Sequence, residues 1–122
     1  MKSTDFKIII SIVNKGDACH VVAASKKVGA EGGTIVKGRG TGIHETMKLF
    51  GSAIEPEKEI VLTLVPENIK DKVLESIIKE AGLNKPGKGI AFLLDVERVA
   101  GITHLLDDEM RDKLEDKLED NN

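Results

Sequence analysis

The segment EIVLTLVPENIKDKVLESIIKEAG, residues 59–82, is the most informative about the fold, because it joins a strand pattern directly to a helix pattern. Residues 59–65 are apolar and rich in β-branched side chains, which predicts a strand that Pro66 ends. Apolar residues then recur at helical spacing on one face of residues 67–82: Ile69, Val73, Ile77 and Ile78. Because Lys and Glu fill the opposite face and Gly82 is a C-terminal cap signal, this segment is predicted to be an amphipathic helix.

A similar strand-helix unit precedes this one in the chain. The apolar, β-branched run FKIIISIV (6–13) predicts a central strand rather than an edge strand. Apolar spacing over residues 18–28 predicts a helix with Asp17 as its N-cap and Gly29 as its C-terminal signal. Two further strands are predicted, one over residues 32–38 and one over residues 90–99.

The order of these elements is strand-helix-strand, a long loop, and strand-helix-strand again. Two such units predict an α+β ferredoxin-like sandwich, in which both helices cover one face of a four-stranded antiparallel sheet. This domain is expected to span residues 1–106 and to include a long loop at residues 40–57. Residues 107–122 carry eight acids and three bases and are predicted to be a charged C-terminal tail, either a short helix or disordered.

Composition bounds the possible functions of the chain. With 122 residues and 40% hydrophobic content, it is expected to form one domain. A net charge of −3 and an aromatic content of 2% argue against nucleic acid as a partner. The single cysteine, Cys19, excludes an intramolecular disulfide and a cysteine-based zinc site. No apolar run suits a membrane span or a signal peptide, so we expect a cytoplasmic protein.

Two glycine-rich segments place glycines on both sides of a cation. These are VKGRGTG (36–42) and LNKPGKG (83–89). In such segments backbone N–H groups can turn toward one point while the positive side chain reaches the same anion. Neither segment matches a P-loop or a Rossmann fingerprint. The pattern alone therefore fits both a phosphate site and plain turns.

The same two segments, together with VLTLVPENIKDKVLESIIKEA and KPGKGIAFLLDVERV, resemble the PII family of nitrogen-regulatory signal proteins. The resemblance runs from about Phe6 to Ile102. It implies a ferredoxin-like fold, a homotrimer, and an adenine nucleotide (ADP, ATP or AMP) bound as an effector between neighbouring subunits. It further implies that the long loop regulates a membrane transporter or a metabolic enzyme of nitrogen or carbon metabolism.

The resemblance also implies roles for individual residues. The phosphates would lie against one group from the second glycine segment: Lys85, Gly87, Lys88 and Gly89. A second group would approach them from the base of the long loop, and in this arrangement the two turns come from adjacent chains: Gly38, Arg39, Gly40 and Thr41. Thr34 and Leu64 would line the adenine pocket. The apolar residues of the loop would contact the partner: Ile43, Met47, Leu49, Phe50 and Ile54.

Several positions depart from the family pattern. Ile90 replaces the family's lysine after the second glycine, and Gly101 and Thr103 replace its phosphate-binding arginines. Because charge-assisted contacts are among the strongest hydrogen bonds, their loss predicts weaker triphosphate binding than in typical members. The chain contains no tyrosine to nucleotidylate and no glutamine for the family's magnesium and 2-oxoglutarate site. A 2-oxoglutarate response is therefore not expected.

Three other functions fit the sequence less well. A CutA-like metal-tolerance trimer shares the architecture, but the three histidines and one cysteine have no spacing typical of a metal site, and we predict none. A sheet that binds single-stranded RNA would need more aromatic residues on its strands. An acylphosphatase-like enzyme would need an arginine and an asparagine at a phosphate loop, for which Arg39 and Asn14 have unsuitable spacing. No nucleophile is paired with a base, so we predict no catalytic residues and no enzyme.

Overall fold

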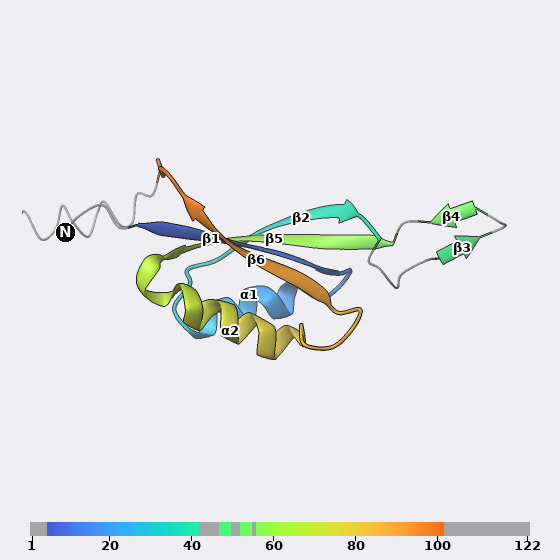
Figure 1. Ribbon diagram of the computed structural model, residues 1–122, viewed down its shortest axis with the longest axis horizontal. Coiled ribbons are helices and arrows are strands. Elements are labelled where there is room, and N and C mark those ends of the chain that lie inside the picture. The colour runs from blue at the N-terminus through green and yellow to red at the C-terminus, as the bar shows by residue number, and fades with distance from the viewer. Residues whose placement is uncertain (1–4, 42–46, 50–51, 55, 102–122) are drawn as a thin grey trace, which may run out of the picture.

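The computed structural model describes residues 5–41, 47–49, 52–54 and 56–101. Its elements in chain order are β1 (Phe6–Asn14), α1 (Ala18–Lys27), β2 (Thr34–Arg39), β3 (Met47–Leu49), β4 (Ser52–Ile54), β5 (Glu57–Pro66), the 3₁₀ turn η1 (Glu67–Ile69), α2 (Lys70–Ala81) and β6 (Gly89–Val96). Four strands form an antiparallel sheet in the order β2-β5-β1-β6, and both helices lie on one of its faces (Figure 1). The predicted ferredoxin-like α+β fold is confirmed.

The hydrophobic core lies between the sheet and the two helices. As predicted, β1 is central and pairs with both β5 and β6. Because side chains alternate along a strand, every second residue of β1 and β5 faces the helices. Fully buried side chains from both layers meet there: Ile9, Val13, Val61 and Val65 from the strands, and Val21, Val73 and Ile77 from the helices.

Several boundaries differ from those predicted. Strand β5 begins at Glu57 instead of residue 59, because charged residues continue the ladder beyond the apolar run that signalled it. Strand β6 ends at Val96 instead of residue 99. Within the stretch predicted to be an irregular loop, β3 and β4 pair as a small antiparallel hairpin beyond one end of the main sheet (Figure 1). The charged tail, Ile43 and Phe50 lie outside the described residues.

The two helices end and begin by different means. Gly82 closes α2 in the left-handed conformation with φ +70°, as its position predicted. Asp17 occupies the N-cap position of α1, but its side chain makes no capping hydrogen bond. Instead, Glu59 Oε1 on β5 accepts the N–H groups of Gly16 at 2.7 Å and Ala18 at 3.1 Å. The start of α1 is therefore fixed by a residue more than forty positions away.

The face of the sheet opposite the helices is apolar and exposed. Residues of β6 that pair with the outward-facing isoleucines of β1 form one side of it, and apolar residues of β2 and β5 extend it. Its large exposed members are Val36, Leu64, Ile90, Phe92 and Leu94, with exposed fractions of 37–52%. None of the described elements covers this face. Among the described residues, no helix is both long and apolar enough to cross a membrane.

Candidate functional site

Both glycine segments lie at the same end of the sheet. The ladder pairs Gly38 with Lys58, Lys58 with Asn14, and Val13 with Gly89. Strands β2 and β6 are the two edges of the sheet, so within one chain the segments are separated by β5 and β1 (Figure 1). At about 4.8 Å per strand this separation is roughly 14 Å. The two segments therefore do not form one cradle within a chain, and their convergence across a subunit boundary stays a prediction.

The glycine-lysine segment is a true turn. Gly87 has φ +80° and Gly89 has φ +135°, values that favour glycine. The Gly87 N–H has no acceptor within the part of the chain that the structure describes, so it is available to an anion. The Lys88 N–H donates within the turn to Lys85 O at 3.3 Å, and Lys88 Nζ lies 3.6 Å from Asp17 Oδ2. In the predicted phosphate loop, the Gly87 N–H is thus free, whereas the Lys88 side chain is paired with Asp17.

The segment around Arg39 is the end of a strand. Gly38 continues the ladder, and neither it nor Gly40 has a positive φ. The Gly40 N–H donates to Pro56 O at 3.2 Å, which closes the base of the long segment. Because that donor is occupied, the side chain of Arg39 is the feature of this segment best able to hold an anion. The structure gives Thr41 as exposed beside it.

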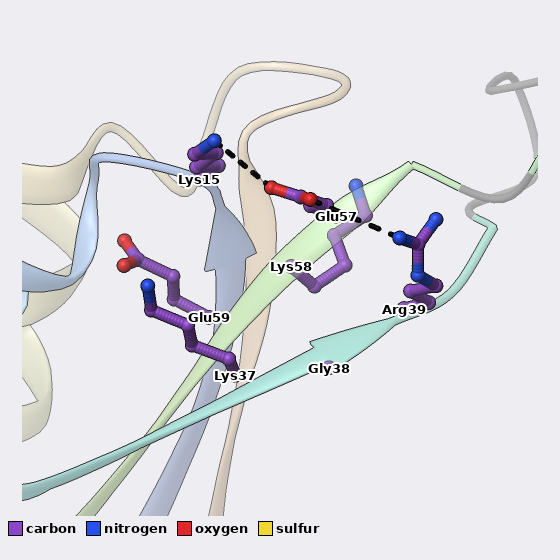
Figure 2. A pocket seen from close by; sticks show the side chains of 7 residues that line it. All are labelled: Lys15, Lys37, Gly38, Arg39, Glu57, Lys58 and Glu59. Atoms are coloured by element: carbon purple, nitrogen blue, oxygen red, sulfur yellow. Dashed lines mark ion pairs between the residues drawn. The ribbon is translucent and has the colours of Figure 1, made fainter.

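A charged pocket of about 560 Å³ lies at this strand end (Figure 2). Its lining contains four cations and two carboxylates: Lys15, Lys37, Gly38, Arg39, Glu57, Lys58 and Glu59. Figure 2 shows Glu57 between Lys15 and Arg39; its Oε2 lies 3.0 Å from Lys15 Nζ and its Oε1 3.9 Å from Arg39 Nη2. The ion pair with Lys15 lowers the pKa of Glu57, and the positive charges of Arg39 and Lys37 lower it further. Glu57 is therefore ionised at neutral pH, and its carboxylate lies between Lys15 and Arg39.

Sequence reasoning named Arg39 and Gly38 for this site but missed the other lining residues. Lys15 belongs to the turn after β1, and Glu57 and Lys58 precede the apolar run that marked β5. The signal that could have found them is the alternation of acid and base in residues 57–59, directly before the apolar run of β5. Only the pairing of β5 with β1 and β2 brings them together.

A second pocket, of about 290 Å³, contains the two residues predicted to line an adenine site. Its lining includes Thr34 and Leu64 together with Phe6, Gly29, Glu31, Gly32, Gly33, Leu62 and Pro66. Leu64 pairs with Ile8, whereas Gly89 pairs with Val13, five residues further along β1. At about 3.4 Å per residue this pocket and the glycine-lysine turn are roughly 17 Å apart along the sheet. The pocket predicted for the base and the turn predicted for the phosphates therefore lie near opposite ends of one chain's sheet.

The other titratable groups with shifted pKa values form an ion network that lines neither pocket. Glu67 lies 2.7 Å from Lys70 Nζ and 2.9 Å from Lys7 Nζ, and Lys7 also pairs with Asp95. Hydrogen bonds from Lys70 and Lys7 lower the pKa of Glu67, and those to Asp95 and Glu67 raise the pKa of Lys7. This network joins β1, η1 and β6, which is a structural role. No group of three or more metal-ligating side chains is present in the described ranges.

The fold and the site define an α+β ferredoxin-like protein with a charged pocket at the base of a long segment. The model of the nitrogen regulatory protein P-II matches residues 6–104, and the chain belongs to this family. P-II proteins are regulators that act in signal transduction, not catalysts, so the chain is a P-II-like signalling protein.

A solved structure of Arabidopsis thaliana PII bound to citrate is similar in fold. Its TM-score is 0.63 at 24% sequence identity, and the match covers 82% of this chain and 85% of that chain. A search of curated proteins gave no match. The predicted family membership is confirmed.

Proposed function

We propose that the protein is a homotrimeric signalling subunit that binds an adenine nucleotide between neighbouring chains. Through residues 40–57 it would then regulate a membrane transporter or a metabolic enzyme. The observation that carries this proposal is the separation of the two half-sites. The pocket with Thr34 and Leu64 and the turn with Gly87 lie near opposite ends of one chain's sheet. A ligand with a base at one end and phosphates at the other can engage both half-sites when they come from different chains.

The exposed apolar sheet face supports the assembly. Leu64 belongs both to this face and to the pocket proposed for the base. A neighbouring chain that covers the face would therefore also close the pocket. Because burial of this face removes apolar surface from water, it favours association of the chains. The same association would complete the pocket.

The groups expected to meet the phosphates support a phosphorylated ligand with few phosphates. The Gly87 N–H and the Arg39 guanidinium are donors suited to phosphate oxygens. Lys88 is already paired with Asp17, and Ile90 supplies no charge. We therefore expect ADP or AMP to bind at least as tightly as ATP.

Calorimetry with AMP, ADP and ATP tests this proposal. The wild-type protein should bind at least one of them, and Arg39→Gln should weaken that nucleotide about 10- to 100-fold, because a charge-assisted contact is lost. Lys72→Gln on the exposed face of α2 is the matched control, with the same change in net charge. Citrate, which the Arabidopsis protein holds in its structure, serves as a second ligand. Heat from citrate without heat from any nucleotide would reject the nucleotide site, as would equal affinities of the Arg39 variant and the wild type.

Glu57 provides a second prediction at this site. Its carboxylate sits between Lys15 and Arg39, where it competes with any incoming anion. Glu57→Gln removes the competitor and should tighten nucleotide binding about 3- to 10-fold, a modest change because exposed ion pairs are weak. Glu75→Gln on α2 removes one negative charge away from the pocket and should leave the affinity within about twofold. Equal tightening by both variants would show that net charge alone accounts for the effect.

A further inference from the structure

Three groups form a chain of hydrogen bonds across the proposed phosphate end of the sheet. Lys58 Nζ donates to Asn14 Oδ1 at 2.7 Å, and Asn14 Nδ2 donates to Gly87 O at 2.9 Å. Lys58 is the second residue of β5, Asn14 is the last residue of β1, and Gly87 is in the turn before β6. One side-chain amide thus connects the base of the long segment with the glycine-lysine turn.

This chain of hydrogen bonds requires a side chain at position 14 that can both accept and donate, and the amide of Asn14 does both. An ammonium group can only donate hydrogen bonds, and a backbone carbonyl can only accept them. The side chain between them must therefore accept on one side and donate on the other, and this requirement also fixes the orientation of the Asn14 amide. A carboxylate of the same shape could accept from Lys58 but would present a second acceptor to Gly87 O.

The hydrogen bond from Asn14 to Gly87 O helps to set the direction of the turn, together with the bond from the Lys88 N–H to Lys85 O. The C=O of Gly87 and the N–H of Lys88 belong to one planar peptide group, so fixing one fixes the other. The preceding peptide supplies the Gly87 N–H that is free for an anion. Because Gly87 has φ +80° and no atom lies within 4 Å of the point that a Cβ would occupy there, packing alone does not fix this part of the turn.

The opposite end of the chain of hydrogen bonds is well fixed. The residue Lys58 is only 8% exposed, and it pairs across the ladder with both Asn14 and Gly38. Pro56, two positions before Lys58, accepts the Gly40 N–H that closes the base of the long segment. A change at Gly87 would therefore reach this base through Asn14.

We infer that Asn14 is a positioning residue that orients the Gly87 turn for the anion. When an anion binds to this turn, Asn14 transmits the change to Lys58. This inference rests on the proposed nucleotide function. It adds a mechanism: the turn and the base of the regulatory segment respond together because one amide holds both. Asn14 itself touches no ligand in this mechanism.

The test compares Asn14→Asp with the matched control Asn68→Asp. Asn68 is in η1, next to Lys7's partner Glu67 and at the end of β1 away from Asn14. ADP affinity is measured by calorimetry, and the response of the base is measured as the change in the amide NMR signals of Lys58 and Gly40 at saturating ADP. Asn14→Asp should weaken ADP about 5- to 20-fold, since one hydrogen bond becomes a repulsion. It should also reduce the saturated response at Lys58 and Gly40 by more than half, whereas Asn68→Asp should change neither.

The outcomes separate this inference from the proposed function. If the wild-type protein binds neither ADP nor any other nucleotide, the function fails first. If it binds ADP and Asn14→Asp keeps the full saturated response, transmission through Asn14 is rejected, even if the affinity falls. Should Asn14→Asp not fold, the side-chain amide signals of Asn14 in the wild-type protein decide. They should move with Lys58 during the ADP titration, and their failure to move would overturn the inference.

Discussion

Phe92→Glu is expected to separate the proposed trimer into single chains of 13.2 kDa. Phe92 is 40% exposed in the isolated chain and lies on β6, paired with Ile10 in the middle of the apolar face. In a trimer this ring would be covered, and a carboxylate in its place would be buried among isoleucine and leucine side chains without a partner. Such burial costs at least about 3 kcal/mol, which weakens association by roughly 100-fold or more at each interface.

Light scattering after size-exclusion chromatography measures this prediction directly. The wild-type protein should have about three times the mass of one chain, and Phe92→Glu should have the mass of one. Ile35→Glu is the control, because Ile35 is 47% exposed on the same sheet and pairs with the buried Val61, so its side chain faces the opposite side. This control should remain trimeric. Dissociation of both variants would show general damage to the sheet, and a trimeric Phe92→Glu would place the interface elsewhere.

The fold could be predicted from the sequence because its signals are local. The apolar run determines β1, and the helical spacing from Ile69 to Ile78 together with the cap at Gly82 determines α2, in each case from neighbouring residues. The order of these elements then leaves few topologies. The pairing of β3 with β4 and the two extra residues at the start of β5 could not be predicted, because polar strand ends and short hairpins carry no apolar pattern.

The candidate site could be predicted only in part, because most of its geometry is long-range. The resemblance named Thr34 and Leu64, and one pocket does contain both residues. Glu59 as the cap of α1 and Glu57 between Lys15 and Arg39 depend on strand pairing that no local pattern reports. Composition also cannot show that GKG is a turn while GRG ends a strand. That difference depends on the backbone, where Gly87 and Gly89 have positive φ and Gly38 does not.

The same difference between glycines predicts a large effect on stability. Gly89→Ala should lower the free energy of unfolding by about 3–5 kcal/mol, because it combines strained backbone with overpacking. A Cβ at this position would clash with Ile12 O and would lie 3.2 Å from Val13 Cα. These are backbone atoms of the central strand, so they cannot move without breaking the pairing of β1 with β6. The φ of +135° adds a conformation that alanine rarely adopts.

Gly87→Ala is the matched comparison two residues earlier in the same turn. Its φ of +80° carries a similar kind of backbone cost, but no atom lies within 4 Å of the added Cβ. We expect a loss of about 1 kcal/mol for this variant. Thermal unfolding at one fixed chain concentration, which removes the effect of oligomerisation on the midpoint, should place Gly89→Ala about 10–20 °C below the wild type and Gly87→Ala within about 6 °C.

Equal midpoints for the two variants would contradict the close contact between Gly89 and β1. If the difference holds, the two glycines have separate roles: Gly89 lets β6 pair closely with β1, and Gly87 leaves an amide free for a ligand. A loss of ADP binding in Gly89→Ala would then report the damaged strand pairing. The same loss in the folded Gly87→Ala variant would report the turn itself, which makes Gly87 the position at which the proposed phosphate contact is tested.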